Sequence, residues 1–569
     1  LLDAALPEDW EIYVQPHLNG CRPDFVLLSS LRGVAVIEVK DVSKPDEAFF
    51  RRAIGTLRIY ESEIEEIYCP TIEQRAGKVI ASRSARLVLT NVNRHDLNAA
   101  TSPGLRRRMV AADELHEITR LVPGVLSVPQ EMASDVVADL RSWLDEPRCS
   151  REQRHPLFRE LNAKQRTLVG QGPGSPGQRR VRGSAGSGKS LVLAARAAHL
   201  AKYEGKRGLV TSFNLTLLHY LRDLAVRYPV PERNALVNEF VTWLHFHAWC
   251  KRICFEAGMS DQYAALWRGL TTENRSSPLD SALPALTREA LKISNPQYDF
   301  IMVDEGQDWQ PDWWRTVQDS LRPGGEIMLV ADRTQNLYGR RAKWTDSSMA
   351  GAGFRGNWTT LETSYRLPST VIPKVRYFAS RFIRTGINLP EVDPQATLVP
   401  CVVEWTNVRR GEEAGRCAEA VARLHRGDVI GERVSPPDIV LLVQDRKTGE
   451  KCVAELGRRG YKVCHTFSEF PDEQKRLKNA FFRGDARVKA TTYQSFKGFE
   501  NSLVVVVVTS ASLERDLRGV YVALTRVRQD AAGSALMVIN STPELRGLEL
   551  AWATPGAPVH ETIPFSPEG

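Results

Sequence analysis

The feature that most restricts the fold of this chain is a glycine-rich loop that ends in lysine and serine. Gly183–Ser190 reads GSAGSGKS, fits the pattern G-x4-G-K-S, and stands between an expected strand over Arg180–Arg182 and an Ala-rich helix over Leu191–Lys202. Glycines let backbone N–H groups close around a phosphate at a helix N-terminus, where the helix dipole also favours anions. The lysine then reaches the β- and γ-phosphates of a nucleotide, and the serine hydroxyl binds Mg²⁺. The residues assigned to this predicted site are Gly183, Gly186, Gly188, Lys189 and Ser190.

A pair of acids follows an apolar run further along the chain. Asp299–Val303 is typical of a buried strand, and Asp304 and Glu305 come directly after it. We expect Asp304 to bind Mg²⁺ together with Ser190, and Glu305 to orient or activate an attacking water. Strand ends are often acidic, so the pair alone proves little. Together with the phosphate loop it favours hydrolysis of a nucleoside triphosphate.

Strand-like and helix-like segments alternate along most of the chain. This rhythm is typical of α/β folds with parallel sheets. Before the phosphate loop, the sequence predicts strands over Arg32–Val39 and Arg86–Val92 and a helix over Asp46–Ile67. After the loop, the predicted buried strands are Gly208–Ser212, Phe300–Val303, Glu326–Val330, Asp438–Val443, Val488–Thr492 and Leu503–Thr509.

Composition narrows the class of protein. A chain of 569 residues is long enough for three or four domains, and its net charge of +8 favours a polyanionic partner. The longest uninterrupted apolar run, Leu503–Val508, is too short to cross a membrane, and no secretory signal opens the sequence. The nine cysteines include no CxxC pair, and Cys250 and Cys254 fall in an expected helix. We therefore expect reduced thiols, no zinc site, no membrane partner and a cytoplasmic location.

Several motifs together resemble those of one enzyme family. Asp304–Asp308 reads DEGQD and resembles the DExQD motif of UvrD/Rep-type superfamily 1 helicases. Seven further segments resemble the other family motifs in family order, and together the motifs cover about residues 160 to 540. The resemblance implies two RecA-like parallel-sheet motor domains that use ATP and Mg²⁺ to move along single-stranded DNA. The segments are Leu161–Gln165, Val210–Asn214, Val241–His245, Ala331–Tyr338, Leu361–Arg366, Thr491–Glu500 and Tyr521–Arg526.

The resemblance also assigns roles at the nucleotide. Arg366 and Arg526 become cationic clamps on the γ-phosphate, where hydrolysis gathers negative charge. A surface ion pair is the alternative for either arginine. The remaining assignments are Gln165 to reading of adenine, Gln335 to sensing of the γ-phosphate, Tyr365 to stacking on adenine, and Glu500 to the nucleotide site.

A translocating motor also needs stacking platforms and phosphate contacts for its strand. For each aromatic candidate, packing in the core is an equally good account. After Tyr338 the family shows an aromatic residue followed by Arg-Gly-Ala, but this chain reads GRRAKW, so the stacking aromatic has moved to Trp344 or is lost. Accessory insertions also look reduced, which favours translocation over unwinding. The candidates for the DNA strand are Phe213, Asn214, Thr242, Trp243, His245, Tyr338 and Thr492.

The beginning of the chain carries a second acidic pattern. Asp24 lies on one expected strand, a turn follows, and Glu38 and Lys40 lie on the next strand. The period of two along a strand puts Glu38 and Lys40 on the same face. The two acids are then expected to hold Mg²⁺, with Mn²⁺ possible, while the lysine steadies the attacking water or the developing charge.

This pattern resembles the PD-(D/E)xK nuclease fold, and its NERD (nuclease-related) branch in particular, which is known to be fused to helicases. The resemblance makes Glu8 or Glu11 a candidate for a further acid on a helix. The related helix pattern keeps its tyrosine at Tyr60 but lacks its glutamine, so activity does not follow from the resemblance. The alternative is an edge strand whose charges prevent aggregation.

The sequence therefore predicts an α/β protein in which a PD-(D/E)xK-like nuclease domain precedes two RecA-like domains. Its expected function is that of an ATP- and Mg²⁺-dependent DNA translocase or helicase, 3′ to 5′ by resemblance, fused to a metal-dependent DNA nuclease. The predicted parts are the nuclease-like domain (1–115), a helical connector (116–160), the first RecA-like domain (161–350) with a small accessory insertion near 250–295, the second RecA-like domain (351–550), and a flexible tail (551–569).

Other accounts of the function stay open at this point. The nuclease-like domain could be inactive and serve only to grip DNA or recruit a partner. The motor could be an ATP-driven clamp for a partner nuclease or a defence-system protein, and an RNA strand is not excluded because nothing reads a 2′-hydroxyl. The favoured partners are single-stranded or forked DNA, in DNA repair or in defence against foreign DNA.

Overall fold

The computed structural model divides the chain into two compact units. The first comprises Leu1–Cys149 and Ser468–Arg487, and the second comprises Ser150–Phe467 and Val488–Gly569. We describe each unit by itself. The structure describes residues 2–16, 23–64, 82–126, 132, 134–144, 161–170, 177–183, 186–214, 216–228, 234–268, 278–332, 354, 357–361, 363–364, 367–383, 391–392, 401–481 and 484–553.

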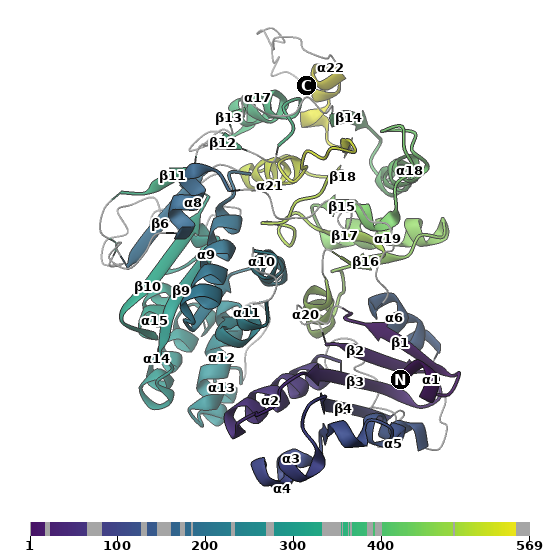
Figure 1. Ribbon diagram of the computed structural model, residues 1–569. Coiled ribbons are helices and arrows are strands. Elements are labelled where there is room, and N and C mark those ends of the chain that lie inside the picture. The colour runs from purple at the N-terminus through teal and green to yellow at the C-terminus, as the bar shows by residue number, and fades with distance from the viewer. Residues whose placement is uncertain are drawn as a thin grey trace. The chain divides into compact units, whose positions relative to one another are not determined.

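The first unit is built on a five-stranded mixed sheet in the order β1-β2-β3-β4-β5 (Figure 1). β1 pairs with β2 and β2 with β3 in antiparallel fashion, whereas β4 runs parallel to both β3 and β5. The strands are β1 (Trp10–Val14), β2 (Phe25–Ser29), β3 (Gly33–Lys40), β4 (Ser82–Leu89) and β5 (Met109–Val110). The first five helices of this unit are α1 (Leu2–Ala5), α2 (Glu47–Glu63), α3 (Arg94–Ala100), α4 (Pro103–Arg106) and α5 (Ile118–Leu121).

Local sequence explains the centre of this sheet. The run Val34–Ile37 is buried throughout, so both faces of β3 are covered. Helix α2 packs on β3 and β4, and its start is capped by Asp46, whose side chain accepts a hydrogen bond of 2.7 Å from the Phe49 amide. β3 is therefore the central strand of the sheet, and its charged residues do not lie on an edge strand.

Two distant segments of the chain complete the first unit. α6 (Ser134–Leu144) comes from the expected connector, and α20 (Pro471–Ala480) comes from the crossover between two strands of the second unit. The Arg487 guanidinium lies over the Trp143 ring at 4.1 Å, and it also donates to Asp485, with 2.8 Å between Nη2 and Oδ2. Asp485 and Trp143 are both buried. The crossover is therefore part of the first unit, although the strands on either side of it belong to the second.

The second unit contains two six-stranded sheets in which all strand pairings among the described residues are parallel. The first sheet has the order β11-β6-β10-β9-β7-β8. Its strands are β6 (Gln178–Gly183), β7 (Gly208–Ser212), β8 (Val241–Trp243), β9 (Tyr298–Asp304), β10 (Leu321–Ala331) and β11 (Thr359–Leu361). Its helices are α8 (Ala163–Gly170), α9 (Lys189–Glu204), α10 (Leu217–Val226), α11 (Asn234–Phe240), α12 (Phe246–Glu256), α13 (Ser260–Ala265), α14 (Leu283–Ser294) and α15 (Pro311–Gln318).

Helices cover both faces of this first parallel sheet. α9 packs against β6, β7, β9 and β10. The opposite face is filled by α12, α14 and α15, whose Phe246, Leu291 and Trp313 join Ile301 and Leu329 of the sheet in one buried cluster. The region near 250–295, where an accessory insertion is expected, therefore contributes to the core of this sheet.

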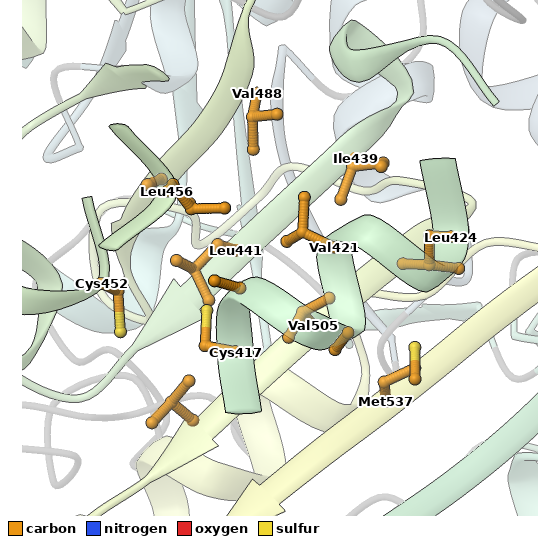
Figure 2. Packing of buried hydrophobic residues seen from close by; sticks show 14 of the residues in the cluster. Cys417, Val421, Leu424, Ile439, Leu441, Cys452, Leu456, Val488, Val505 and Met537 are labelled. Atoms are coloured by element: carbon orange, nitrogen blue, oxygen red, sulfur yellow. The ribbon is translucent and has the colours of Figure 1, made fainter. Parts of the chain in front are cut away.

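The second parallel sheet has the order β14-β19-β18-β15-β17-β16. Figure 2 shows one face of it, where Leu441 and Val505 of the sheet pack against Val421 of α18 and Leu456 of α19. α21 packs against β18. The elements are β14 (Cys401–Asn407), α18 (Glu413–Arg426), β15 (Ile439–Val443), α19 (Arg446–Arg458), β16 (Val463–His465), β17 (Val488–Thr492), β18 (Leu503–Val508), α21 (Glu514–Leu524), β19 (Ser534–Asn540) and α22 (Leu548–Ala553), with α17 (Ile372–Phe382) before them and a two-stranded pair β12 (Thr363–Ser364) and β13 (Glu391–Val392).

The predicted α/β class with parallel sheets is confirmed. The six buried runs expected after the phosphate loop correspond to β7, β9, β10, β15, β17 and β18, with ends that differ by a few residues. The helix expected at Leu191–Lys202 lies within α9, and Cys250 and Cys254 lie on α12 as free, buried thiols. Across the ranges given above, no helix is long and apolar enough to span a membrane.

Removing Arg487 tests whether the crossover stabilises the first unit. Arg487→Ala should lower the free energy of unfolding by about 3 kcal/mol, because Asp485 would stay buried without its partner. Urea denaturation followed by tryptophan fluorescence measures the change, and faster hydrogen exchange in α6 assigns it to this unit. Arg58→Ala, an exposed position on α2, is the control and should change stability by less than about 0.5 kcal/mol. Equal effects of the two substitutions would contradict the assignment.

Candidate nucleotide and metal sites

The phosphate loop joins β6 to α9, and its glycines are required by backbone shape. Gly186 and Gly188 have φ values of 82° and 84°, a region that favours glycine, and Gly188 precedes the first turn of α9. A Cβ on Gly183 would lie 2.3 Å from Ser187 Oγ and 2.6 Å from the Leu361 carbonyl oxygen. The loop therefore presents the N-terminus of α9, the place where backbone amides bind anions.

Lys189 points back into this loop. Its Nζ donates to the Gly183 carbonyl oxygen at 2.9 Å and to Asp332 Oδ2 at 3.1 Å. Asp332 follows β10 and is 1 % exposed. Sequence reasoning missed Asp332, although an acid directly after a predicted buried strand beside β9 was a usable signal. The two bonds hold the Lys189 ammonium within the loop.

Asp304 ends β9 and is buried beside the loop. Burial, followed by the neighbouring Glu305, raises the pKa of the carboxyl to about 7, and the Ser190 side chain opposes this rise. Its Oδ1 accepts from the Glu305 amide at 2.7 Å, while Oδ2 meets no hydrogen-bond partner among the residues described. A buried carboxylate oxygen beside a hydroxyl fits a hard divalent cation such as Mg²⁺, which usually takes one or two protein ligands and completes its shell with water and phosphate.

Glu305 is held in an unusual conformation. Its φ of 52° lies in the left-handed region, which is uncommon for a residue with a side chain. Gln307 Nε2 donates to Glu305 Oε2, and Gln307 Oε1 accepts from the Asp332 amide at 2.8 Å. Gln307 therefore links the carboxyl ends of β9 and β10 and fixes the direction of the predicted catalytic carboxylate.

A lysine from the second parallel sheet reaches the same acids. Lys497 lies in the 493–500 loop after β17, and its Nζ is 2.6 Å from Asp308 Oδ2 and 3.5 Å from Glu305 Oε2. All three side chains are buried. Burial raises the pKa of Asp308 to about 6, and Lys497 opposes that rise. Lys497 belongs to the motif Thr491–Glu500, but no role was predicted for it from the sequence.

Gln165 lies against the phosphate loop from α8. Its Nε2 donates to the Ser187 carbonyl oxygen at 3.1 Å, and its Oε1 accepts from the Asn162 amide at 3.0 Å. A Cβ on Gly188 would come within 2.5 Å of Gln165 Nε2, so the two positions are packed tightly. Gln165 thus supports the loop, and its reading of adenine stays a prediction.

Arg526 follows α21, is buried, and donates hydrogen bonds to nearby backbone carbonyl groups. Its Nε donates to the Val522 carbonyl oxygen at 2.9 Å and its Nη1 to that of Phe499 at 3.3 Å. The Glu500 carboxylate lies 4.0 Å from Arg528 Nε. Arg526 must leave these carbonyl groups before it can act on a phosphate.

Several residues predicted to bind the DNA strand have structural contacts. Phe213 stacks on Trp313 with ring centroids 5.7 Å apart, and His245 Nδ1 caps α12 by accepting from the Ala248 amide at 3.3 Å. Asn214 Nδ2 donates to the carbonyl oxygens of Ser495 and Lys497 at 3.3 and 2.9 Å. Thr242 and Trp243 lie on β8, and Thr492 ends β17 with its Oγ1 3.2 Å from Ser495 Oγ.

Part of the predicted site lies outside the described residues, namely Gln335, Tyr338, Tyr365, Arg366 and the alternative stacking residue Trp344. Their roles stay predictions.

In the first unit, the structure brings Asp24, Glu38 and Lys40 together. Asp24 Oδ2 accepts from the Val39 amide at 2.7 Å, and Lys40 Nζ lies 2.5 Å from Glu38 Oε1. Burial raises the pKa of Glu38, Lys40 opposes this, and the nearby Asp24 adds to it. Glu38 Oε2 is buried and has no hydrogen-bond partner in the described part of the chain, which fits a place for a cation between the two acids.

The edge-strand alternative and the expected helix acid are both wrong. β3 is an interior strand, because β2 pairs with it as far as Ile37 and β4 pairs with it as far as Lys40. Glu11 does not lie on a helix but on β1, where its Oε1 accepts from Arg141 Nε at 2.9 Å; Glu8 lies in a turn. No cluster of three or more His, Cys, Asp or Glu residues suited to a metal ion occurs in the ranges described.

The chain matches no model of a known protein family, and no curated protein matches it.

The raised pKa of Asp304 predicts that Mg²⁺ binding depends on pH. The metal needs the ionised carboxylate, so lowering the pH from 8 to 6, across a pKa of about 7, should weaken Mg²⁺ affinity about tenfold. Titration of Mg²⁺ against the nucleotide-bound chain, followed with a fluorescent ADP analogue, measures this. Asp304→Asn is the control, since any pH dependence that remains in it belongs to other groups. An identical pH profile in the two proteins would rule out Asp304 as the titrating ligand.

Proposed function

We propose that this chain is an ATP- and Mg²⁺-dependent translocase or helicase on single-stranded DNA, of the UvrD/Rep type, joined to a metal-dependent DNA nuclease. The observation that carries the motor assignment is the acid pair Asp304–Glu305, buried at the end of β9 and linked through Ser190 to the phosphate loop. Two all-parallel sheets in one unit are consistent with two RecA-like motor domains. The ordered motifs between about residues 160 and 540 support the same family.

In the proposed reaction, water attacks the γ-phosphorus, the bond to the bridging oxygen breaks, and ADP and phosphate leave. Glu305 accepts the proton of the attacking water, with its direction set by Gln307. Lys189 exchanges the Gly183 carbonyl and Asp332 for phosphate oxygens. Mg²⁺ held by Ser190 and Asp304 would neutralise phosphate charge.

The second sheet contributes the remaining positive charge in this proposal. Arg526 would leave the carbonyl groups of Val522 and Phe499 for the developing charge on the γ-phosphate, and Arg366 would join it by family resemblance. Because that exchange would accompany hydrolysis, it would tie the second sheet to the nucleotide state. Movement along a strand, 3′ to 5′ by resemblance, would follow from repeated cycles.

For the first unit we propose a PD-(D/E)xK-type nuclease of the NERD branch. Asp24 and Glu38 would hold Mg²⁺ or Mn²⁺, which polarises a phosphodiester and activates water. Lys40 would steady the charge that develops on phosphorus. The buried Glu38 oxygen that meets no partner among the described residues is the observation that favours a cation here.

One observation favours a second candidate for the first unit, a DNA-gripping domain that does not cut. Glu11, a candidate for the additional acid, is engaged by Arg141, so Asp24 and Glu38 are the two carboxylates that the described residues supply. A domain of this kind would bind DNA ends and leave cutting to a partner nuclease or a defence-system protein. In either form, DNA repair or defence against foreign DNA is the context that we propose, on analogy with fused nuclease–helicases.

Lys189→Ala should reduce steady-state ATP hydrolysis by at least about a hundredfold, because the phosphates lose their charged partner. A coupled assay with single-stranded DNA measures the rate. Lys292→Ala, on the exposed side of α14, serves as the control and should keep the rate of the natural chain. Hydrolysis that survives in Lys189→Ala would refute the motor assignment.

Lys40→Ala should abolish cutting of DNA while ATP hydrolysis remains. The assay uses an end-labelled forked DNA with Mg²⁺ or Mn²⁺ and ATP, resolved on a gel. Lys44→Ala, an exposed lysine after the same strand, is the matched control. Fragments that disappear only in Lys40→Ala support the nuclease, whereas separated but intact strands with the natural chain support the gripping domain. DNA that stays paired and intact would favour an ATP-driven clamp.

A further inference from the structure

Lys40 lies at the end of its strand, where the neighbouring strands support it least. β2 pairs with β3 only as far as Ile37, and the last pair between β3 and β4 joins Lys40 to Leu89. The Lys40 side chain is 36 % exposed. The end of a strand frays more readily than its centre, so the direction of this lysine depends on further restraints.

One restraint acts just before the lysine, on the side of β2. Beyond the last β2 pair, the Val39 amide donates to Asp24 Oδ2 at 2.7 Å, so a side chain replaces a backbone acceptor there. Lys40 Nζ also lies 2.5 Å from Glu38 Oε1. These contacts hold one side of the strand end and leave the other side to β4.

A second restraint follows the lysine and is formed by three polar side chains. Asp41 Oδ1 accepts from Thr90 Oγ1 at 3.0 Å and from Asn91 Nδ2. The Thr90 amide also donates to the Lys40 carbonyl oxygen at 3.3 Å. Thr90 and Asn91 come directly after β4, so these bonds tie the ends of β3 and β4 together. We call Asp41, Thr90 and Asn91 the strand-end clamp.

Global stability does not account for the strand-end clamp. Asp41 and Asn91 are exposed, and a hydrogen bond in contact with water adds little net free energy because water can replace either partner. The effect of the clamp is therefore local, at the sheet end that carries Lys40. Its place, one residue after the lysine of the proposed nuclease site, gives this local effect a consequence for function.

We propose that Asp41 is a positioning residue for Lys40 in the proposed cleavage of DNA. The inference rests on the proposed nuclease and adds a residue on which its site depends. Asp41 does not touch the reacting phosphate, but through Thr90 and Asn91 it fixes the end of β3. The Lys40 ammonium then stays beside Glu38, where charge develops on phosphorus. A displacement of about 1 Å in such a group can slow a reaction about a hundredfold.

The test measures metal-dependent cutting of an end-labelled forked DNA by the full chain. In Asp41→Ala, kcat should fall at least about tenfold, while KM for DNA should not rise, because a negative charge beside a polyanion is removed. Asp41→Asn keeps an oxygen that can accept from Thr90 and Asn91, and it should recover most of kcat. Asp96→Ala is the matched control and should keep the natural rate, since Asp96 is an exposed acid of the same unit that accepts from Asn93 Nδ2 at 3.0 Å.

Hydrogen exchange reports on the strand-end clamp without any cutting. In Asp41→Ala the Thr90 amide should exchange at least about tenfold faster, because the end of the β3–β4 pair frays. Exchange at the buried Val36 should stay unchanged, and the midpoint of thermal unfolding should move by less than about 3 °C. Unchanged exchange at Thr90 would overturn the proposal, as would faster exchange together with the natural kcat.

A role for Asp41 as a metal ligand predicts a different result. Loss of a ligand would raise the Mg²⁺ concentration needed for half-maximal cutting in both Asp41→Ala and Asp41→Asn, because only the carboxylate carries the charge that attracts the cation. The positioning role predicts the same Mg²⁺ concentration in both variants and the natural chain. A raised requirement in both variants would therefore overturn the proposal.

The same assay distinguishes failure of this inference from failure of the proposed function. A natural chain that cuts DNA and an Asp41→Ala variant that cuts it equally fast would overturn the role of Asp41 alone. A natural chain that cuts no DNA with Mg²⁺ or Mn²⁺ would refute the nuclease, and the inference with it.

Discussion

Buried carboxylates at the ends of parallel strands need positive charge nearby, and this requirement organises the larger unit. Asp304, Glu305, Asp308 and Asp332 gather at the carboxyl ends of β9 and β10, and each is buried. Burial makes ionisation costly, which is why the pKa values of Asp304 and Asp308 are raised. Among the described residues, Lys189 and Lys497 contact this group, through Asp332 and Asp308.

The two lysines reach these acids by different routes, and the difference has consequences. Lys189 begins α9, which packs on the sheet whose β10 leads to its partner Asp332. Lys497 comes from the 493–500 loop of the other sheet, so its contact exists only while that loop is seated by Asn214 and Thr216. The contact of Lys497 with Asp308 therefore depends on how the two sheets of the second unit pack together.

Much of this could be predicted because it follows from local pattern. Apolar runs marked the buried strands, and a strand that ends in Asp304 and Glu305 marked the edge where parallel strands present their side chains. The same rule would have found Asp332 after β10. The pairing of Lys497 with Asp308 could not be predicted from the sequence, because the two residues are 189 positions apart and follow strands of different sheets. Glu11 was misjudged for a related reason, since its partner Arg141 lies on a helix whose position no local pattern reveals.

Local sequence patterns could not predict the division of the chain into two units either, and this division constrains how the chain can fold. β16 and β17 are neighbours in the second parallel sheet, with Val463 opposite Val488, yet the chain between them belongs to the first unit. Phe481 and Asp485 on this crossover are buried, and Arg487 covers Trp143. A chain cut after residue 149 would separate Arg487 from the Trp143 ring that it covers. The first unit therefore joins segments that lie far apart in the sequence, which no local pattern can reveal.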